Sequence, residues 1–140
     1  MYMDEAIQSV YDWNLRFGHI TGDPVEDAHR WKYSVEHRDL ALDLIEEEVR
    51  ELTDAVIYRN KIEMIDAVCD ILVTTFGLAA KAGINQYIPE AFREVMSSNW
   101  SKLDADGNPV YYDSGKIGKS DLYYPPNISE IIEGIDEGVL

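Results

Sequence analysis

The stretch that decides the fold of this chain reads RDLALDLIEEEVREL and runs from Arg38 to Leu52. Its pattern predicts a helix, and a helix turns by about 100° per residue. In that projection most of the acidic side chains gather with one leucine in roughly one third of the circle: Leu44, Glu47, Glu48 and Glu51. An apolar stripe lies beside them and comprises Ile45, Val49, Leu52 and Val56. The acids therefore border the predicted core, where an ionised carboxylate is costly to desolvate unless positive charge compensates it.

A second helix of the same character is predicted from the sequence IEMIDAVCDILVTTFG, residues 62–77. Glu63, Asp66 and Asp70 follow the spacing i, i+3, i+7 and share one side of an otherwise apolar helix. A short turn at residues 59–61 would make the two helices antiparallel and bring the acids opposite one another. Converging carboxylates repel, and a hard divalent cation with oxygen ligands, Mg²⁺ or Mn²⁺, is the natural counter-charge. For the glutamates of the first helix, an ordinary solvated acidic face is the alternative interpretation.

The composition indicates one globular domain. The chain has 140 residues, 46% of them hydrophobic, and a net charge of −15. Such a charge repels phosphate backbones, so we expect no nucleic-acid partner. Cys69 is the single cysteine and is expected in the core. Residues 1–5 lack a signal-peptide pattern and no apolar run reaches membrane-spanning length, so we expect no membrane partner and a cytoplasmic location.

Apolar periodicity and stop signals predict helices over residues 4–17, 38–58, 61–82 and 89–98, and a short one from Ser129. Asp23 followed by Pro24 predicts the start of another short helix. After Trp100 the chain becomes rich in glycine, proline and tyrosine, with an extended segment at residues 110–112. The expected fold is all-α. We expect one domain over residues 1–140. It consists of a four-to-five-helix bundle in residues 1–100 and an irregular C-terminal arm in residues 101–140, and the arm has room for a short hairpin.

Several aromatic and histidine residues have two interpretations. Trp13 fits either the core or the wall of a pocket. Trp31 stands among charged residues and fits either a packed connection or a ring that stacks on a nucleobase. His19, His29 and His37 lack the mutual spacing of metal ligands, so we assign them structural or surface roles.

Three segments taken together resemble the all-α nucleoside triphosphate pyrophosphohydrolases, the MazG-like and phosphoribosyl-ATP pyrophosphohydrolase-like enzymes. They are EEVREL at residues 47–52, DAVCDIL at residues 66–72 and SNWSKL at residues 98–103. The arm is similar to versions found in phages and bacteria, with DGN at 106–108, GKIGK at 115–119 and YPP at 124–126. The resemblance spans roughly residues 38–128, and the ordered combination is more specific than the first motif alone.

The chain departs from the family in its second acidic motif, Glu-x-x-Asp. Asp70 matches the aspartate of that motif, but Ala67 stands where the glutamate is expected, and Asp66 comes one residue earlier. The sequence EMID at residues 63–66 fits the motif literally, with a short gap after Glu51. Whether Glu63 or Asp70 completes the acidic motif stays open, and Asp66 belongs to both alignments.

The resemblance implies Mg²⁺-dependent hydrolysis of a nucleoside triphosphate, expected to be a deoxynucleotide, to the monophosphate and pyrophosphate. It implies metal ligands at Glu48, Glu51, Asp66 and Asp70 or Glu63, and a water-activating role for Glu47. The expected substrate contacts are Asn99, Lys102, Lys116, Lys119 and Trp31. Two alternatives are phosphoribosyl-ATP as substrate and a non-catalytic acidic helical module that binds a partner.

Assembly and the arm complete the expectations. The helix at residues 62–77 is apolar on most sides, and such a helix is normally buried on all sides. We do not expect one small subunit to cover it, and the resembling enzymes form dimers or dimers of dimers, so we expect a homodimer or homotetramer. The arm after Trp100 is expected to fold over the acidic helices and to bring Lys116 and Lys119 toward the triphosphate.

Overall fold

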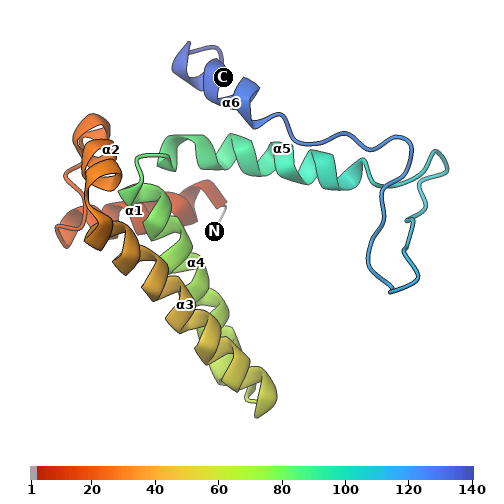
Figure 1. The fold of residues 1–140 in the computed structure, drawn as a ribbon, viewed down its shortest axis with the longest axis horizontal. Coiled ribbons are helices and arrows are strands. Elements are labelled where there is room, and N and C mark those ends of the chain that lie inside the picture. The colour runs from red at the N-terminus through yellow and green to blue at the C-terminus, as the bar shows by residue number, and fades with distance from the viewer. Residues whose placement is uncertain (1–2) are drawn as a thin grey trace. The chain divides into compact units, whose positions relative to one another are not determined.

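The computed structural model describes residues 3–140, and its elements are helices (Figure 1). In chain order they are α1 (Met3–Arg16), α2 (Pro24–Tyr33), α3 (Val35–Ile57), α4 (Lys61–Lys81), the 3-10 turn η1 (Asn85–Tyr87), α5 (Ile88–Trp100) and α6 (Ile128–Asp136). The predicted all-α fold is confirmed, with six α-helices in the described part of the chain. Helix α2 begins where Asp23 and Pro24 predicted it, because the Asp23 carboxylate accepts a hydrogen bond from the Val25 N–H at 3.0 Å.

The chain forms two compact units, Met1–Gln86 and Tyr87–Leu140. Helix α5 therefore packs within the second unit, although its residues were grouped with the bundle of residues 1–100 on sequence alone. The treatment of residues 1–140 as one functional domain stays a prediction.

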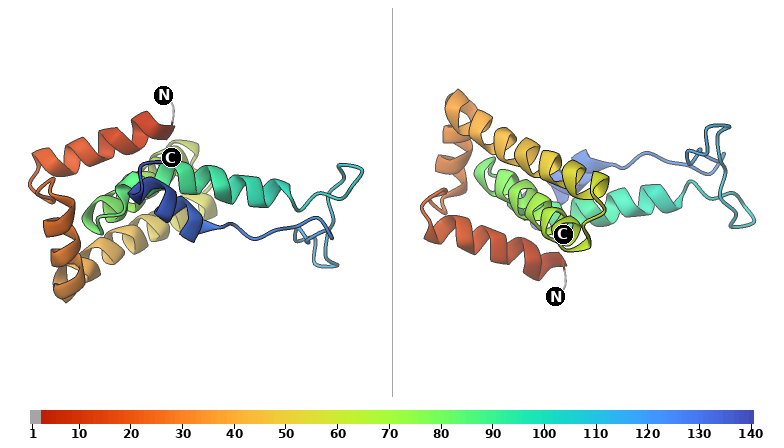
Figure 2. Two further views of the ribbon diagram at one scale, coloured as in Figure 1. Left: turned by 90° about the horizontal axis from the view of Figure 1, so that it is seen from above. Right: turned by 90° about the horizontal axis from the view of Figure 1, so that it is seen from below.

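Helices α3 and α4 form an antiparallel hairpin and make the most extensive packing contact of the first unit (Figures 1 and 2). The predicted turn at residues 59–61 is confirmed. The Asn60 N–H donates to the Ala55 carbonyl at 2.9 Å, and the Arg59 N–H donates to the Val56 carbonyl at 3.2 Å. This pair of bonds is a Schellman motif, and it holds Arg59 at a φ of 54°. Asn60 then caps α4 by accepting from the Glu63 N–H.

Small and polar side chains form the seam between α3 and α4. On α3, Ala41 and Ala55 are buried, and Glu48 lies seven residues from each. On α4, Ala67 is buried. Positions seven residues apart share one face when two helices pack side by side. Small side chains at such a contact let the two backbones approach closely.

The apolar stripe predicted for α3 is only partly confirmed as core. Ile45 and Leu52 are half-buried, whereas Val49 and Val56 are 45% and 55% exposed. The buried face of α3 follows the alanines instead, because close approach of the two backbones favours the smallest side chains. Cys69 was also expected in the core, and this expectation was wrong: the residue is exposed on the α4 surface.

Helices α1 and α2 cover one end of the hairpin. Helix α1 packs against α4, and α2 contacts both hairpin helices. The loop between α1 and α2 is held by the buried Asp27, which accepts hydrogen bonds from the N–H and hydroxyl of Thr21 and from the Gly22 N–H. Asn14 is buried on α1, donates to the Val10 carbonyl at 2.9 Å and contacts the His19 ring.

The second unit consists of α5, the irregular arm and α6. The buried Ser98 hydroxyl donates to the Tyr124 carbonyl at 2.8 Å, and the Asn127 N–H donates to Glu94 at 3.1 Å. A single antiparallel bridge joins Tyr111 and Ile117, so the arm turns back on itself as a minimal hairpin. Among the helices that the structure describes, none is long and apolar enough to cross a membrane.

Candidate metal centre

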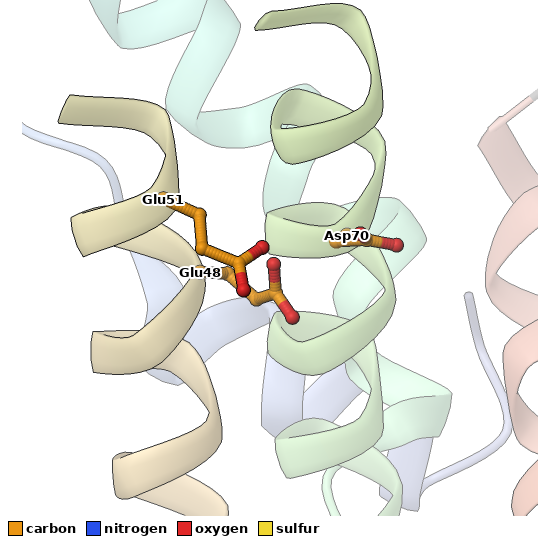
Figure 3. Close-up of side chains that lie close together, drawn as sticks. All are labelled: Glu48, Glu51 and Asp70. Atoms are coloured by element: carbon orange, nitrogen blue, oxygen red, sulfur yellow. The ribbon is translucent and has the colours of Figure 1, made fainter. Parts of the chain in front are cut away.

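Three carboxylates of the hairpin converge at the seam. Glu48 and Glu51 extend from α3 toward α4, and Asp70 comes from α4 (Figure 3). One oxygen from each lies within 4.8 Å of the others. The helices explain the convergence, because Glu48 and Glu51 are three residues apart and so share a face. Across the seam, the antiparallel register set by the turn brings Asp70 to the same level.

Glu48 is the most constrained of the three. Its Oε2 atom is buried and has no hydrogen-bond partner among the described residues. Burial, a hydrogen bond with Glu51 and the neighbouring negative charges raise the pKa of Glu48 to about 7. A buried carboxylate oxygen without a partner is unfavourable, so this position favours a cationic ligand.

Repulsion among the three carboxylates also favours a bound cation. A pair of unit charges 4.8 Å apart costs about 1 kcal/mol in water and about 3.5 kcal/mol at an effective dielectric constant of about 20. Burial and the charges of Asp66 and Glu51 raise the pKa of Asp70 as well. Three oxygen ligands with this charge fit a hard divalent cation, and they offer no sulfur or imidazole that would favour a softer metal.

The other acidic candidates lie around this cluster. Glu47 is exposed beside Glu48 and contributes to its raised pKa. Asp66 is exposed and acts on Asp70 through its charge, but it lies outside the group of three. Glu63 lies nearer the turn, in an open cleft of about 300 Å³ that it shares with Glu51. The structure thus brings Asp70 to Glu48 and Glu51, while the roles of Asp66 and Glu63 stay predictions.

The predicted substrate contacts are spread over both units. Trp31 is half-buried on α2, and its ring packs edge-on to His37 at 6.1 Å between centroids. The remaining four belong to the second unit: Asn99, Lys102, Lys116 and Lys119. Lys119 places its ammonium 4.7 Å from the centre of the Tyr123 ring, which is a cation–π distance. Their approach to the carboxylates stays a prediction.

One side chain of this region was missed by the sequence analysis. Lys81 ends α4 and is buried, although lysine is almost never fully buried without a partner. A signal for it exists in the sequence. Lys81 continues a stripe with alternating spacings of three and four residues, the spacing of a helix-packing face, through Ala67, Asp70, Thr74 and Gly77.

Comparison with known proteins identifies the class to which this fold and site belong. A family model described as phosphoribosyl-ATP pyrophosphohydrolase matches residues 16–99. The chain belongs to this family, which is part of the MazG-like all-α nucleoside triphosphate pyrophosphohydrolase superfamily. The resemblance stated from the sequence is therefore confirmed.

One curated relative is an uncharacterized protein, L479, of Acanthamoeba polyphaga mimivirus, 41% identical over 81 residues. That match covers 56% of this chain and 31% of the relative, so the chain spans about a third of the relative's length. No solved structure gives a significant match.

In metal-free protein, Glu48→Gln is expected to raise the melting temperature by an amount that grows with pH. The pKa of Glu48 is raised from 4.5 to about 7 in the folded state. Its contribution to stability is therefore complete below about pH 4.5 and is lost as the pH rises through 7. Glutamine has no proton to lose, so the gap between variant and wild type should widen from pH 4.5 to 7 and then level off. Thermal unfolding in the presence of a chelator, repeated across this pH range, measures the difference in melting temperature between the variant and the wild type.

Glu46→Gln is the matched control, because Glu46 is exposed on the same helix. Saturating Mg²⁺ at pH 8 should stabilise the wild type more than Glu48→Gln, since the amide is a weak ligand for a hard cation. A gap that does not change with pH, or an equal Mg²⁺ response in both proteins, would contradict this centre.

Proposed function

We propose that this protein is a pyrophosphohydrolase that cleaves a nucleoside triphosphate to the monophosphate and pyrophosphate, with Mg²⁺ as cofactor and Mn²⁺ as a possible substitute. The observation that carries the proposal is the buried, unpartnered oxygen of Glu48 within a group of three carboxylates. Membership of the family supports the same reaction class.

Glu48, Glu51 and Asp70 are the residues that would hold the metal, with Asp66 and Glu63 as further candidates. A bound Mg²⁺ supplies charge neutralisation for the phosphate oxygens and makes a bound water more acidic. Glu47 is exposed next to the cluster, where its carboxylate can orient that water and accept its proton. In this proposal Asn99, Lys102, Lys116 and Lys119 contact the phosphates, because an acidic protein needs local cationic groups to bind them.

A second candidate substrate is phosphoribosyl-ATP. The description of the matching family names it, and the same carboxylates could serve either substrate. We propose a free nucleoside triphosphate as the preferred substrate, and a deoxynucleotide as the preferred form of it. The ground for this order is that motifs of the arm are similar to the phage and bacterial versions.

The assembly that we propose is a homodimer or homotetramer. Large apolar side chains remain exposed along α3 and α4 of the single subunit, among them Ile62 at 77%, Ile65 at 58% and Val56 at 55%. Exposed apolar side chains on adjacent helices support a protein–protein contact. Most soluble oligomers consist of copies of one chain, so a second copy of this protein is the partner that we propose for this surface.

Incubation with Mg²⁺ and a panel of ribo- and deoxyribonucleoside triphosphates, with phosphoribosyl-ATP included, should release pyrophosphate and a monophosphate. Glu51→Gln and Asp70→Asn should each lower turnover by more than the roughly 10- to 100-fold that loss of an outer-shell metal partner costs. Asp66→Asn tests whether Asp66 is also a ligand, and Glu46→Gln is the control. Release of orthophosphate would indicate another class of phosphohydrolase, and no turnover of any substrate would favour an interaction module.

Sedimentation velocity at micromolar protein concentration tests the assembly. We expect a species of at least twice the 16.0 kDa subunit mass, and Val56→Glu should shift it toward the monomer because a charge cannot be buried unpaired. Sedimentation of the wild type as a single 16.0 kDa species would reject the oligomer.

A further inference from the structure

A small cavity lies in the first unit between α1, α3 and α4. Its volume is about 150 Å³, and Trp13, Leu44 and Val73 form its apolar walls. An engineered apolar cavity of about 150 Å³ in another protein holds benzene. The space therefore matches a single six-membered ring such as that of a pyrimidine base.

Lys81 lines this cavity, and its positive charge is not neutralised. The residue is 6% exposed, and within residues 3–140 its ammonium makes no ion pair or hydrogen bond. Burial and the charge of Arg30 lower the pKa of Lys81. No carboxylate is among the charges that act on Lys81 within the described residues, and the buried Asp27 accepts from Thr21 and Gly22 instead. A buried donor without an acceptor is unfavourable, so the cavity favours a ligand that presents an oxygen.

The same cavity also contains a hydrogen-bond acceptor. The Asn14 amide nitrogen donates to the Val10 carbonyl, so its oxygen is the group that accepts from His19 Nδ1 at 3.0 Å. Burial, followed by the charges of Lys81 and Arg30, lowers the pKa of His19 and favours the neutral ring. In that state Nε2 is an acceptor. One cationic donor and one neutral acceptor suit a base edge that carries both a carbonyl and an N–H, whereas an anion would be repelled by the acceptor.

Gly77 keeps the cavity open. It lies inside α4, where glycine is less favourable than alanine. A Cβ added at Gly77 would meet the Asn14 side chain at 3.5 Å, an ordinary van der Waals contact. The protein's own packing therefore does not require a glycine here, but an added methyl group would occupy space in the cavity that Gly77 lines.

The cavity is close to the carboxylates along both helices of the hairpin. Leu44 lies four residues before Glu48, and Thr74 lies four residues after Asp70. Four residues span about 6 Å of a helix, or about one turn. A nucleotide whose phosphates bind at the metal centre can therefore extend its base toward the cavity.

We propose that this cavity binds the base of a pyrimidine nucleoside triphosphate, with Lys81 donating to a ring carbonyl oxygen and Trp13 against the face of the ring. The proposal rests on the proposed function and narrows its substrate class. It also provides a base site distinct from the ring of Trp31.

Equilibrium binding of α,β-methylene analogues of UTP, CTP and ATP, and of the corresponding deoxynucleotides, in the presence of Mg²⁺, tests the proposal without turnover. The pyrimidine analogues should bind at least tenfold more tightly than the ATP analogue. Lys81→Met has a similar volume and no charge, and it should abolish that preference because it removes a hydrogen bond from a charged donor. Lys61→Met, at the exposed start of α4, is the control and should behave as the wild type.

Gly77→Ala provides a second variant whose fold is not in question. It should raise the melting temperature by a few degrees, because alanine favours the helix, and it should weaken binding of the pyrimidine analogues. Tighter or unchanged pyrimidine binding by this variant would overturn the proposal.

Other outcomes separate this proposal from the proposed function. Equal binding of the ATP analogue by the wild type, or binding of inorganic phosphate that depends on Lys81, would overturn the base site even if nucleotides are hydrolysed. Pyrimidine binding that depends on Lys81, without turnover of any nucleotide, would support the base site and reject the hydrolytic function.

Discussion

The structure of the first unit depends on a carboxylate placed in the seam of a helical hairpin. Glu48 stands midway between two buried alanines, where an apolar side chain would pack best. Within residues 3–140 its buried Oε2 atom has no hydrogen-bond partner, and oxygens of two further carboxylates lie within 4.8 Å of a Glu48 oxygen. The fold therefore carries an electrostatic cost that burial of the seam alone does not offset, and a cation or a proton must compensate it.

The same seam explains how the hairpin can offer space for a small ligand. A helical hairpin with leucine at every inward position would have no room between its helices. Here α4 presents Asp70, Thr74, Gly77 and Lys81 in succession, so charge and small size replace apolar bulk. On α4, Asp70 lies near the middle of the helix and the buried Lys81 ends it. In a chain of net charge −15, Lys81 is thus a buried cation beside a cavity of about 150 Å³.

Much of this could be predicted from the sequence, because helices are local and acids at helical spacing are conspicuous. The hairpin, its turn and the convergence of acids from both helices follow from periodicity and a short connection. The sequence left open which acid of α4 lies nearest Glu48 and Glu51, and the structure places Asp70 there. The buried face of α3 could not be predicted from the sequence. Hydrophobicity indicates Val49 and Val56 as core residues, whereas the close approach of the two helix backbones favours the alanines. The burial of Lys81 was not predicted, because a lysine at the end of a helix is normally expected to be solvated. Its burial depends on how α1 packs against α4.

Anomalous diffraction from crystals grown with Mn²⁺ tests the central claim most directly. The account predicts an anomalous peak at the seam, bonded to carboxylate oxygens of Glu48, Glu51 and Asp70, and loss of that peak in Glu48→Gln crystals. Mn²⁺ bound elsewhere on the acidic surface while these three carboxylates stay unliganded would contradict it. So would a side chain of the protein donating to the buried oxygen of Glu48, because that oxygen would then need no cation.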